Sequence, residues 1–408
     1  MSDIWKARDT HDVEAAIGKA LAEGTALEIV GHGSKRDLGR PAQSDATLDL
    51  SALKGVTLYE PAELVLSARA GTPLAEIETL IAPHGQELAF EPMDYGPLLG
   101  TAPGRGTIGG VLAINASGPR RIKAGAARDH FLGFTAVSGR GETFKSGGRV
   151  VKNVTGYDLS KLLAGSWGTL AAMTDVTLKV LPRAETEQTV VVEGLDEAAA
   201  VRALTAAMAA PCDVSGAAHV PGALTAGLAP DVPAGRAATV LRLEGVAPSI
   251  AQRRSVLEDV LRPFGPLGIL EGPKSRALWR AIRDVVPLAA AGPLGEHHVW
   301  RISTAPTRGA ELARLIGQKA EIETLYDWAG GLLWLAARPD QGDVAAIVRG
   351  AVRACGGHAR LIRAPAAVRA AADGFDPQDE VLAALTRRVK AAFDPCGVLG
   401  AGRMWAGI

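Results

Sequence analysis

The first residues that could do chemistry form a glycine turn, Gly31-His32-Gly33-Ser34-Lys35, directly after the apolar run 27–30. Glycines in this place allow positive φ and let successive backbone N–H groups point into one concavity, which can hold a phosphate. Ser34 would add a hydroxyl donor. The motif alone is also typical of a structural turn, in which His32 is an ordinary loop histidine and Lys35 and Arg36 are a solvated pair.

The second candidate segment, 103–118, combines five glycines with small or apolar side chains. A solvent-exposed loop has no reason to be this apolar, whereas a loop along a large buried ligand needs small side chains so that its backbone can touch the ligand. Asn115 and Ser117 would then orient the ligand. The alternative is a helix start that is tightly packed in the core.

A third segment, 152–170, mixes a polar turn, a short apolar helix and the turn Gly165-Ser166-Trp167-Gly168-Thr169. A strand follows, and such a turn could supply backbone groups to the edge of a planar ring. A plain helix–turn–strand junction explains Trp167 equally well.

The elements that must position these segments alternate between helix and strand patterns, which predicts an α/β or α+β arrangement. Pro41, shortly after the glycine turn, excludes the long helix that opens a Rossmann dinucleotide fold. The stretch 96–118 reads as loop-rich. The expected helices are 10–23, capped by Asp9 or Thr10, and 74–81, and the expected strands are 27–30, 46–50, 56–59, 64–70, Val137, Val150-Val151 and 173–181.

The order of predicted strands and helices changes after Pro182-Arg183, where we place a domain boundary. Strand and helix patterns recur there in a similar order twice, which predicts an antiparallel sheet with helices on one face, in two related halves. A final helix, 378–392, follows. The expected strands are 189–192, 214–220, 239–243, 299–303, 322–328, 332–336 and 358–362, and the expected helices are 196–209, 249–261, 308–316 and 343–354.

Composition narrows the class of protein. The chain has 408 residues, 44 basic and 44 acidic side chains and a pI of about 7.1, so it lacks the basic face typical of nucleic-acid binding. Its three cysteines are too scattered for a disulfide framework, a metal site or an iron–sulfur cluster. We find no apolar run of membrane-spanning length and no leader pattern, which favours a cytoplasmic protein, attached to a membrane only through partners.

Taken together, the motifs resemble a known family. The glycine turn, Thr-Ile-Gly-Gly at 107–110, Lys-Asn-Val-x-Gly-Tyr-Asp-Leu at 152–159, Gly-Ser-x-Gly-Thr-Leu at 165–170 and the strand ending at Pro182 resemble the FAD-binding module of the vanillyl-alcohol-oxidase (PCMH) type. Within that group the chain is similar to the smaller FAD-binding subunits of bacterial glycolate oxidase. The resemblance is dense over 25–183 and returns at 393–404.

The resemblance implies an α+β fold: a PCMH-type FAD-binding domain of two α/β subdomains at 1–183, an inserted antiparallel-sheet-and-helix cap domain at 184–375, and a segment at 376–408 that returns to the FAD domain. By position, the family's pyrophosphate-binding turn falls on 31–35. The other cofactor-binding positions that it implies are Gly106, Thr107, Gly109, Gly110, Asn115, Gly118, Gly125, Arg128, Met173 and Thr174.

Two departures from the family pattern matter. Relatives that link flavin covalently do so through a histidine just before the serine of the glycine turn, where this chain has Gly33, so the resemblance implies non-covalent FAD. Near the C-terminus the family's Leu-Asn-Pro-Gly is replaced by Leu399-Gly400-Ala401-Gly402. The asparagine contact near the flavin is therefore lost, although Arg403 remains as a cation.

The implied reaction is hydride transfer from a small 2-hydroxy acid, such as glycolate, to flavin, giving glyoxylate or another 2-oxo acid. It needs a base for the hydroxyl proton and a cation for the carboxylate. The sequence offers only the pair His297-His298 with Arg301, and Arg403. Two alternatives stay open: a flavin-holding accessory subunit, and a free-standing dehydrogenase. The implied partners are a larger FAD-binding subunit and an iron–sulfur subunit.

Overall fold

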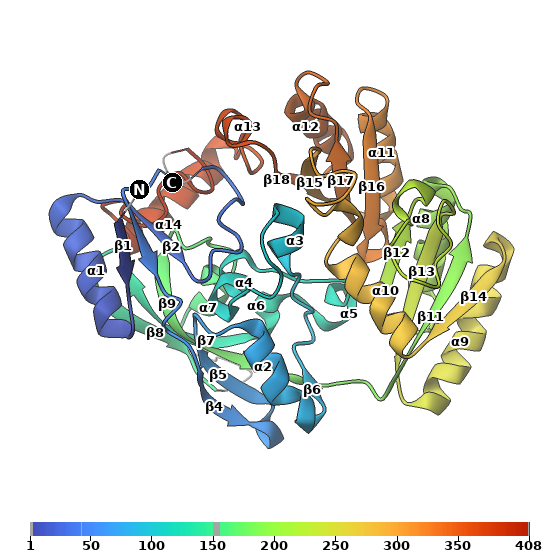
Figure 1. Ribbon diagram of the computed structural model, residues 1–408, viewed down its shortest axis with the longest axis horizontal. Coiled ribbons are helices and arrows are strands. Elements are labelled where there is room, and N and C mark those ends of the chain that lie inside the picture. Colours follow the sequence, from blue (N-terminus) through green and yellow to red (C-terminus); the bar gives the residue numbers. More distant parts are fainter. Residues whose placement is uncertain (1–2, 42, 150–155, 407) are drawn as a thin grey trace.

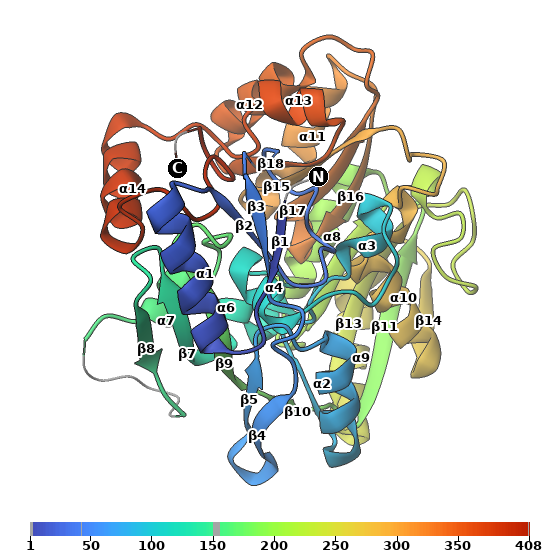
Figure 2. The same ribbon diagram turned by 60° about the vertical axis from the view of Figure 1, so that its left-hand side comes forward.

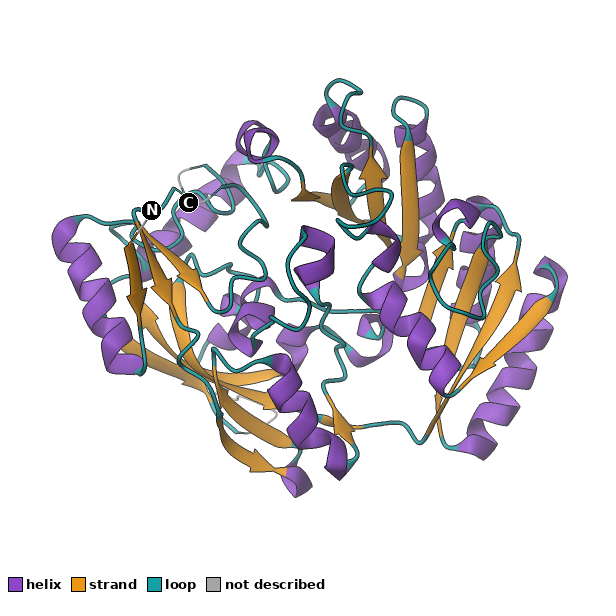
Figure 3. Cartoon of the chain, viewed as in Figure 1, coloured by secondary structure: helices purple, strands orange, loops and turns teal. Residues whose placement is uncertain are grey.

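The computed structural model describes residues 3–41, 43–149, 156–406 and 408. Its long axis joins two β-rich lobes, with short helices and loops between them (Figures 1 and 3). One lobe holds the N-terminal residues, and the other holds a large sheet from the second half of the chain. The mixture of helices with parallel and antiparallel sheets confirms the predicted α+β class.

The first sheet is parallel, in the order β1-β3-β2, and α1 precedes its strand β2. The helix begins where the Asp9 carboxylate accepts the Asp12 N–H at 2.8 Å, and it ends at Gly24, whose φ of 67° a glycine adopts without strain. These elements are β1 (Asp3–Lys6), α1 (Thr10–Glu23), β2 (Leu27–Val30) and β3 (Ala46–Asp49).

The second sheet is antiparallel, in the order β4-β5-β9-β7-β8, and completes the first lobe. The helix α2 (Leu74–Ile81) follows its strand β5, and a two-stranded pair joins β6 (Gln86–Glu87) to β10 (Leu181–Pro182). The strands of this sheet are β4 (Val56–Glu60), β5 (Val65–Arg69), β7 (Phe131–Ser138), β8 (Thr143–Gly147) and β9 (Ala171–Lys179).

The region between the lobes differs from the predicted loop. Residues 96–118 contain a helix in which Thr107 Oγ1 accepts the Gly110 N–H at 3.3 Å, and Asn115 ends this helix with a φ of 52°. Glycine lowers helix propensity, so only tertiary packing stabilises this turn-rich helix. The short helices here are α3 (Tyr95–Leu99), α4 (Ile108–Ile114), α5 (Arg121–Ala124), α6 (Ala127–His130) and α7 (Leu159–Leu163).

The second lobe is built on one eight-stranded antiparallel sheet, in the order β14-β11-β13-β12-β16-β17-β15-β18. Each half repeats the order β-α-β-β-α-β, of which the last strand of the first half was not predicted, and the halves meet where β12 pairs with β16. The strands are β11 (Thr186–Glu193), β12 (Gly216–Val220), β13 (Ala238–Gly245), β14 (Leu267–Glu271), β15 (His298–Ser303), β16 (Ile322–Asp327), β17 (Leu332–Ala337) and β18 (His358–Arg363).

The two faces of this sheet pack against different partners. Trp300 and Ile302 of β15 lie in a core with the helices of one face, while Val299 lies in the core shared with the first lobe. Side chains alternate along a strand, so Arg301 also faces the first lobe. The outer helices are α8 (Glu197–Ala209), α9 (Ala247–Leu261), α11 (Gly309–Gly317) and α12 (Val344–Cys355), and α10 (Pro273–Arg283) covers the inner face.

The last part of the chain returns to the first lobe, as Figure 2 shows for α14, which lies in the lobe that holds α1. After α13 (Ala366–Ala371) and α14 (Glu380–Phe393), Leu399 forms a parallel bridge with Leu27 of β2. Lys390 donates hydrogen bonds of 2.7 Å to the carbonyl oxygens of Thr169 and Leu399 and of 2.6 Å to the Asp394 carboxylate. This buried cation fixes the returning segment beside the turn before β9.

Most predicted elements agree with the structure to within a few residues, and the exceptions are specific. The strands β1, β6 and β14 and the helices α5, α6, α10 and α13 were not predicted. The strand β8 (Thr143–Gly147) lies just before the predicted strand Val150-Val151. That predicted strand and residues 152–155 of the third motif fall outside the described residues. Within the described parts of the chain, no helix is both long enough and apolar enough to cross a membrane.

Candidate functional site

The glycine turn after β2 forms one wall of a crevice. Gly33 has a φ of 74°, which turns the chain sharply, and Ser34 is buried. The N–H groups of the four residues 32–35 donate to no atom of the described chain. Of these four residues only Ser34 is fully buried, but successive N–H groups that are free of protein partners can together hold an anion such as a phosphate.

Lys35 and Arg36 do not behave as the predicted solvated pair. Arg36 bonds Glu28 at 2.7 Å, whereas Lys35 Nζ lies inside the crevice, with Ser34 Oγ at 3.3 Å. Burial lowers the pKa of Lys35 to about 8, against a smaller opposing effect of Asp94. A half-buried ammonium without a bonded carboxylate is suited to a phosphate.

The opposite wall is the start of α4. Glycines are needed at this wall for two different reasons: close packing of the backbone and open space in the crevice. A Cβ on Gly31 would lie 2.7 Å from Thr107 Oγ1, so only glycine lets the turn approach α4 this closely. A Cβ on Gly109 would lie 2.8 Å from the Ala70 carbonyl oxygen. At this glycine the structure therefore matches the alternative interpretation of segment 103–118, a helix start that is tightly packed in the core. Gly110 instead opens toward the crevice, with Lys35 Nζ 3.4 Å from its Cβ position.

The crevice gathers most of the predicted cofactor-binding residues. Its lining shares Ile29, Gly31 and Thr107 with a narrower part, and shares Ile114 and Trp167 with a second cavity. The predicted residues that line the crevice are Gly31, His32, Gly33, Ser34, Lys35, Thr107 and Gly110, those in the narrower part include Gly109 and Met173, and those in the second cavity are Asn115 and Arg128.

Four predicted residues lie outside these linings, and packing accounts for them. Gly106 lies beside Leu74, and a Cβ on Gly125 would be 3.0 Å from the Asp129 carboxylate. A Cβ on Gly118 would be 2.4 Å from the Glu91 carbonyl oxygen, so its glycine is needed for packing. Thr174 is fully buried, 3.2 Å from Thr10 Oγ1.

Arg403 lines the crevice, but its guanidinium is already bonded to other residues of the chain. Its guanidinium donates to Glu28 at 3.2 Å and to the Lys35 carbonyl oxygen at 2.9 Å. Arg403 therefore fixes the glycine turn, and the structure does not support the predicted role as a free cation for substrate.

A second cavity of about 260 Å³ lies between the lobes, where α3 and the loops around α4 to α6 face the inner side of β15 and β18. The hairpin turn after β16 closes it with Trp328, whose Nε1 donates to the Gly118 carbonyl oxygen at 3.0 Å. Its charged and polar lining is Tyr95, Asn115, Ser117, Arg121, Arg128, Arg301, Ser303, His358 and Arg360.

Four guanidiniums in this cavity lack a partner: that of exposed Arg128 and three that are partly buried. Among the described residues, Arg121, Arg301 and Arg360 make no side-chain hydrogen bond and no ion pair. Burial lowers the pKa of Arg301 to about 10, and Arg360 acts in the same direction. The pKa of Arg121 is lowered by burial and then by Arg301, and that of Arg360 by burial and by Arg121. The cavity is therefore strongly electropositive.

Aromatic rings hold Arg121, Arg301 and Arg360 in place. The guanidinium carbons of Arg121 and Arg301 lie 4.6 and 4.9 Å from the centre of the Trp328 ring. Arg360 lies over Phe375, with 5.1 Å between the guanidinium carbon and the ring centre. Cation–π contacts position a guanidinium but leave its N–H groups free for an anion.

The predicted pair of His298 and Arg301 is wrong as a site. Alternation along β15 places His298 on the face that carries Trp300, whereas Arg301 lines the cavity on the opposite face. The sequence prediction missed Arg360 and His358 of β18. Their alternation along a strand was visible, but only the strand order shows that Arg360 pairs with Arg301 and His358 with Ser303.

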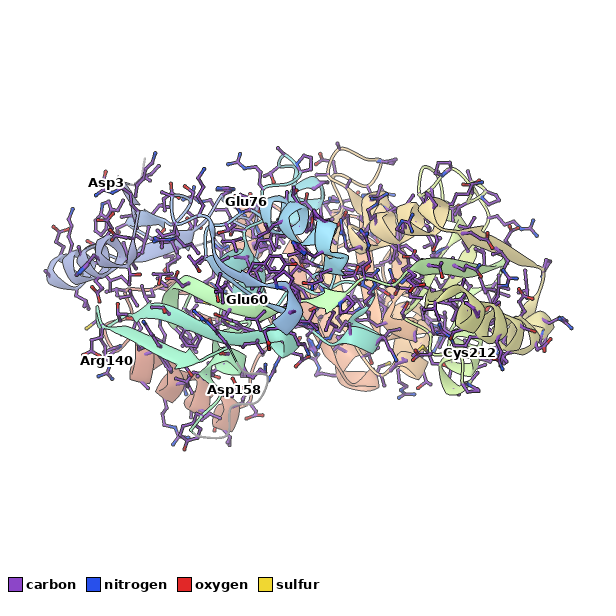
Figure 4. The ribbon with its side chains drawn as sticks, turned by 90° about the horizontal axis from the view of Figure 1, so that it is seen from below. Asp3, Glu60, Glu76, Arg140, Asp158 and Cys212 are labelled. Atoms are coloured by element: carbon purple, nitrogen blue, oxygen red, sulfur yellow. The ribbon has the colours of Figure 1, made fainter. Side chains whose placement is uncertain are left out.

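Metal chemistry finds no support in the described residues, which hold no group of three or more potential metal ligands. The three cysteines are free, and they range from buried Cys212 to exposed Cys396. Figure 4 places Cys212 in the second lobe, far from Asp3 and Arg140 in the first.

Comparisons with known proteins agree with this geometry. A family model described as "FAD binding domain" matches residues 4–147. The chain is 34% identical over 395 residues to "Glycolate oxidase subunit GlcE" of Escherichia coli (strain K12), covering 96% of this chain and 95% of that protein. It is 39% identical over 114 residues to "D-lactate dehydrogenase" of Archaeoglobus fulgidus, 28% of this chain and 24% of that protein.

Solved structures show the same fold at low sequence identity. A p-cresol methylhydroxylase structure superposes with a TM-score of 0.71 at 14% identity, covering 99% of this chain and 88% of that one. FAD is the cofactor of this fold family, and the free N–H groups, half-buried Lys35 and close-approach glycines fit it. The chain thus belongs to the family of FAD-binding glycolate oxidase subunits.

Proposed function

We propose that this chain is the FAD-binding subunit of a glycolate oxidase complex and that it oxidises glycolate, or a similar small 2-hydroxy acid, to the 2-oxo acid. The observation that carries the proposal is that the crevice and the electropositive cavity lie next to each other, because Ile114 and Trp167 line both. When bound, FAD supplies the acceptor for the hydride that leaves the α-carbon.

The crevice residues would hold FAD without a covalent bond. The N–H groups of residues 32–35 and the Lys35 ammonium would bind the pyrophosphate, and Gly31 and Gly110 would let the backbone approach it. Asn115, whose Oδ1 accepts the Arg128 N–H at 2.9 Å, would lie toward the ring end. Gly33 offers no side chain for attachment.

The cavity residues would bind and deprotonate the substrate. Arg301 and Arg360 are paired residues on the neighbouring strands β15 and β18, and both line the cavity. Their guanidiniums can therefore bind one carboxylate together. His358 lines the same cavity, and burial, with Arg360 and Arg301, lowers its pKa. Its imidazole is then neutral near pH 7 and can accept the hydroxyl proton.

We further propose that the chain is divided, as the family suggests, into one unit that binds FAD and one that binds substrate. Residues 1–183 and 376–408 would form the FAD-binding unit, and 184–375 the cap unit that supplies substrate-binding arginines. The proposal is supported by the eight-stranded sheet, whose strands all fall between 186 and 363, and by the bridge of Leu399 to β2.

Electron transfer onward would need partners. A relative that this chain matches at 40% identity over 95 residues, covering 20% of that protein, is "Glycolate oxidase subunit GlcD" of Bacillus subtilis. We propose that a larger FAD-binding subunit of this kind and an iron–sulfur subunit complete the complex, since the scattered cysteines offer no cluster site in this chain.

Anaerobic stopped-flow mixing of the FAD-loaded chain with glycolate and D-lactate tests the proposal. We expect the flavin absorbance to bleach in one turnover and Arg360→Met to slow bleaching at least tenfold, with steady turnover only after the partner subunits are added. Arg276→Met on α10, outside the cavity, is the control.

Two outcomes would replace the proposal by its alternatives. No bleaching with any hydroxy acid, but activity in the reconstituted complex, would make this chain a flavin-holding accessory subunit. Sustained dye reduction by the isolated chain would make it a free-standing dehydrogenase.

A further inference from the structure

The substrate cavity carries more positive charge than a monocarboxylate needs. Arg301 and Arg360 approach from the sheet and Arg121 approaches from α5, and both Arg121 and Arg301 contact the Trp328 ring. None of the three has a hydrogen-bonded or ionic partner among the described residues. A desolvated guanidinium without a counterion is costly, which makes each of them a candidate anion ligand.

The nearby carboxylates do not neutralise this charge. Asp327 is buried, its Oδ1 accepts the Trp328 N–H at 2.7 Å, and burial raises its pKa to about 7. Asp376 is already bonded to Arg349, and its other oxygen accepts the Ala359 N–H at 2.7 Å. His358 adds no negative charge, and Tyr95 stays protonated because burial raises its pKa.

We propose that the cavity prefers a 2-hydroxydicarboxylate over glycolate, with one carboxylate held by Arg301 and Arg360 and the other by Arg121. This inference rests on the proposed function and names the substrate class of the same site. Two carboxylates on one small carbon chain match cations that enter the cavity from two lobes. Arg121 is then the residue that sets specificity.

The placement of Arg121 supports this assignment. Arg301 and Arg360 are Cα partners on β15 and β18 and therefore form one binding edge. Arg121 belongs to another element and makes no pair with the Asp129 carboxylate, which bonds the Ala126 N–H at 2.8 Å. Among the described residues its guanidinium contacts the Trp328 ring and has no hydrogen-bonded partner, so it can meet the far end of a longer acid.

The test uses the FAD-loaded chain and measures flavin bleaching without oxygen. The probes are glycolate, D-lactate, both enantiomers of malate, and tartronate. We expect the half-saturating concentration for the best dicarboxylate to be at least tenfold below that for glycolate. Arg121→Met should reduce this ratio to about one, Arg121→Lys should restore part of it, and Arg276→Met should leave it unchanged.

A second measurement separates this inference from the proposed function. Malonate and succinate cannot be oxidised at a hydroxyl, so their binding is followed by the shift that they cause in the flavin spectrum, with acetate as the monocarboxylate control. If no hydroxy acid bleaches the flavin but succinate or malonate binds at least tenfold tighter than acetate, the oxidation is overturned and the dianion site stands.

The opposite results are equally decisive. If glycolate bleaches the flavin at lower concentrations than every dicarboxylate, the proposed function stands and the dicarboxylate preference is overturned. The same conclusion follows if Arg121→Met and Arg121→Lys both keep the wild-type ratio.

Discussion

Arg301 and Arg360 lie directly opposite each other on neighbouring antiparallel strands, although both are cations. Like charges at such positions destabilise a sheet, by up to about 1 kcal/mol. Burial and this proximity act together to lower the pKa of Arg301 to about 10. Local arrangements that oppose folding in this way are typical of functional sites, and here the arrangement leaves two guanidiniums free to bind an anion.

Gly110→Val should abolish FAD binding while the chain stays folded. The Cβ position of Gly110 is 3.1 Å from Thr107 Oγ1 and 3.4 Å from Lys35 Nζ, so the valine methyl groups would fill the crevice. The flavin-to-protein ratio after purification and a circular dichroism spectrum measure both parts. Gly18→Ala, in α1 with nothing near its Cβ position, is the control. Full FAD content in Gly110→Val would show that the crevice is not the cofactor site.

The affinity for FAD should fall as the pH rises above about 8, because Lys35 has a pKa of about 8 in the free protein. Only the protonated ammonium attracts the pyrophosphate, so the dissociation constant should rise by up to about tenfold per pH unit between pH 8 and 10. Fluorescence titration measures it. Lys35→Arg should remove this pH dependence because arginine stays charged. An identical slope in Lys35→Arg would exclude Lys35 as its source.

Arg242→Met should destabilise the protein, by about 3–5 kcal/mol in the free energy of unfolding. Arg242 is 1% exposed and donates two hydrogen bonds of 2.9 Å to Glu91, which joins the two lobes. Its removal leaves a buried carboxylate without this partner. Arg301→Met, which breaks no ion pair, should change stability by no more than about 1 kcal/mol. Urea denaturation of both variants measures the contrast, and equal losses would contradict it.

The bound flavin should be released by acid. Gly33 occupies the attachment position, with open space around its Cβ position. After precipitation with trichloroacetic acid, we expect all yellow colour in the supernatant, for the wild type and for His32→Ala alike. Flavin absorbance in the washed pellet would show a covalent bond, and its loss in His32→Ala would identify the residue.

Those helices and strands were predictable whose positions follow from the sequence pattern of neighbouring residues. The strand β2 agrees at both ends with its apolar run, and the hairpin of β16 and β17 was visible because a glycine pair separates two apolar runs. The helix α4 was not, because glycines disfavour helix and only packing against Ala70 and its neighbours stabilises it.

The cofactor turn was also predictable, because its glycines and serine are contiguous. The substrate cavity was not. Arg121, Arg301 and Arg360 come from three separate elements, and no short-range pattern relates them. His298 was misplaced because one residue along a strand changes the face on which a side chain lies.

The return of the chain to β2 has a consequence for how the protein is made. Leu399 covers the outer edge of β2, and Arg403 bonds Glu28, 375 positions earlier in the sequence. During translation the glycine turn leaves the ribosome long before these partners exist. Until they arrive, β2 is an uncovered edge strand that could pair with other chains. Flavin loading is therefore a late event that follows synthesis of the intervening sheet, and the nascent N-terminal lobe is the stage at which aggregation threatens.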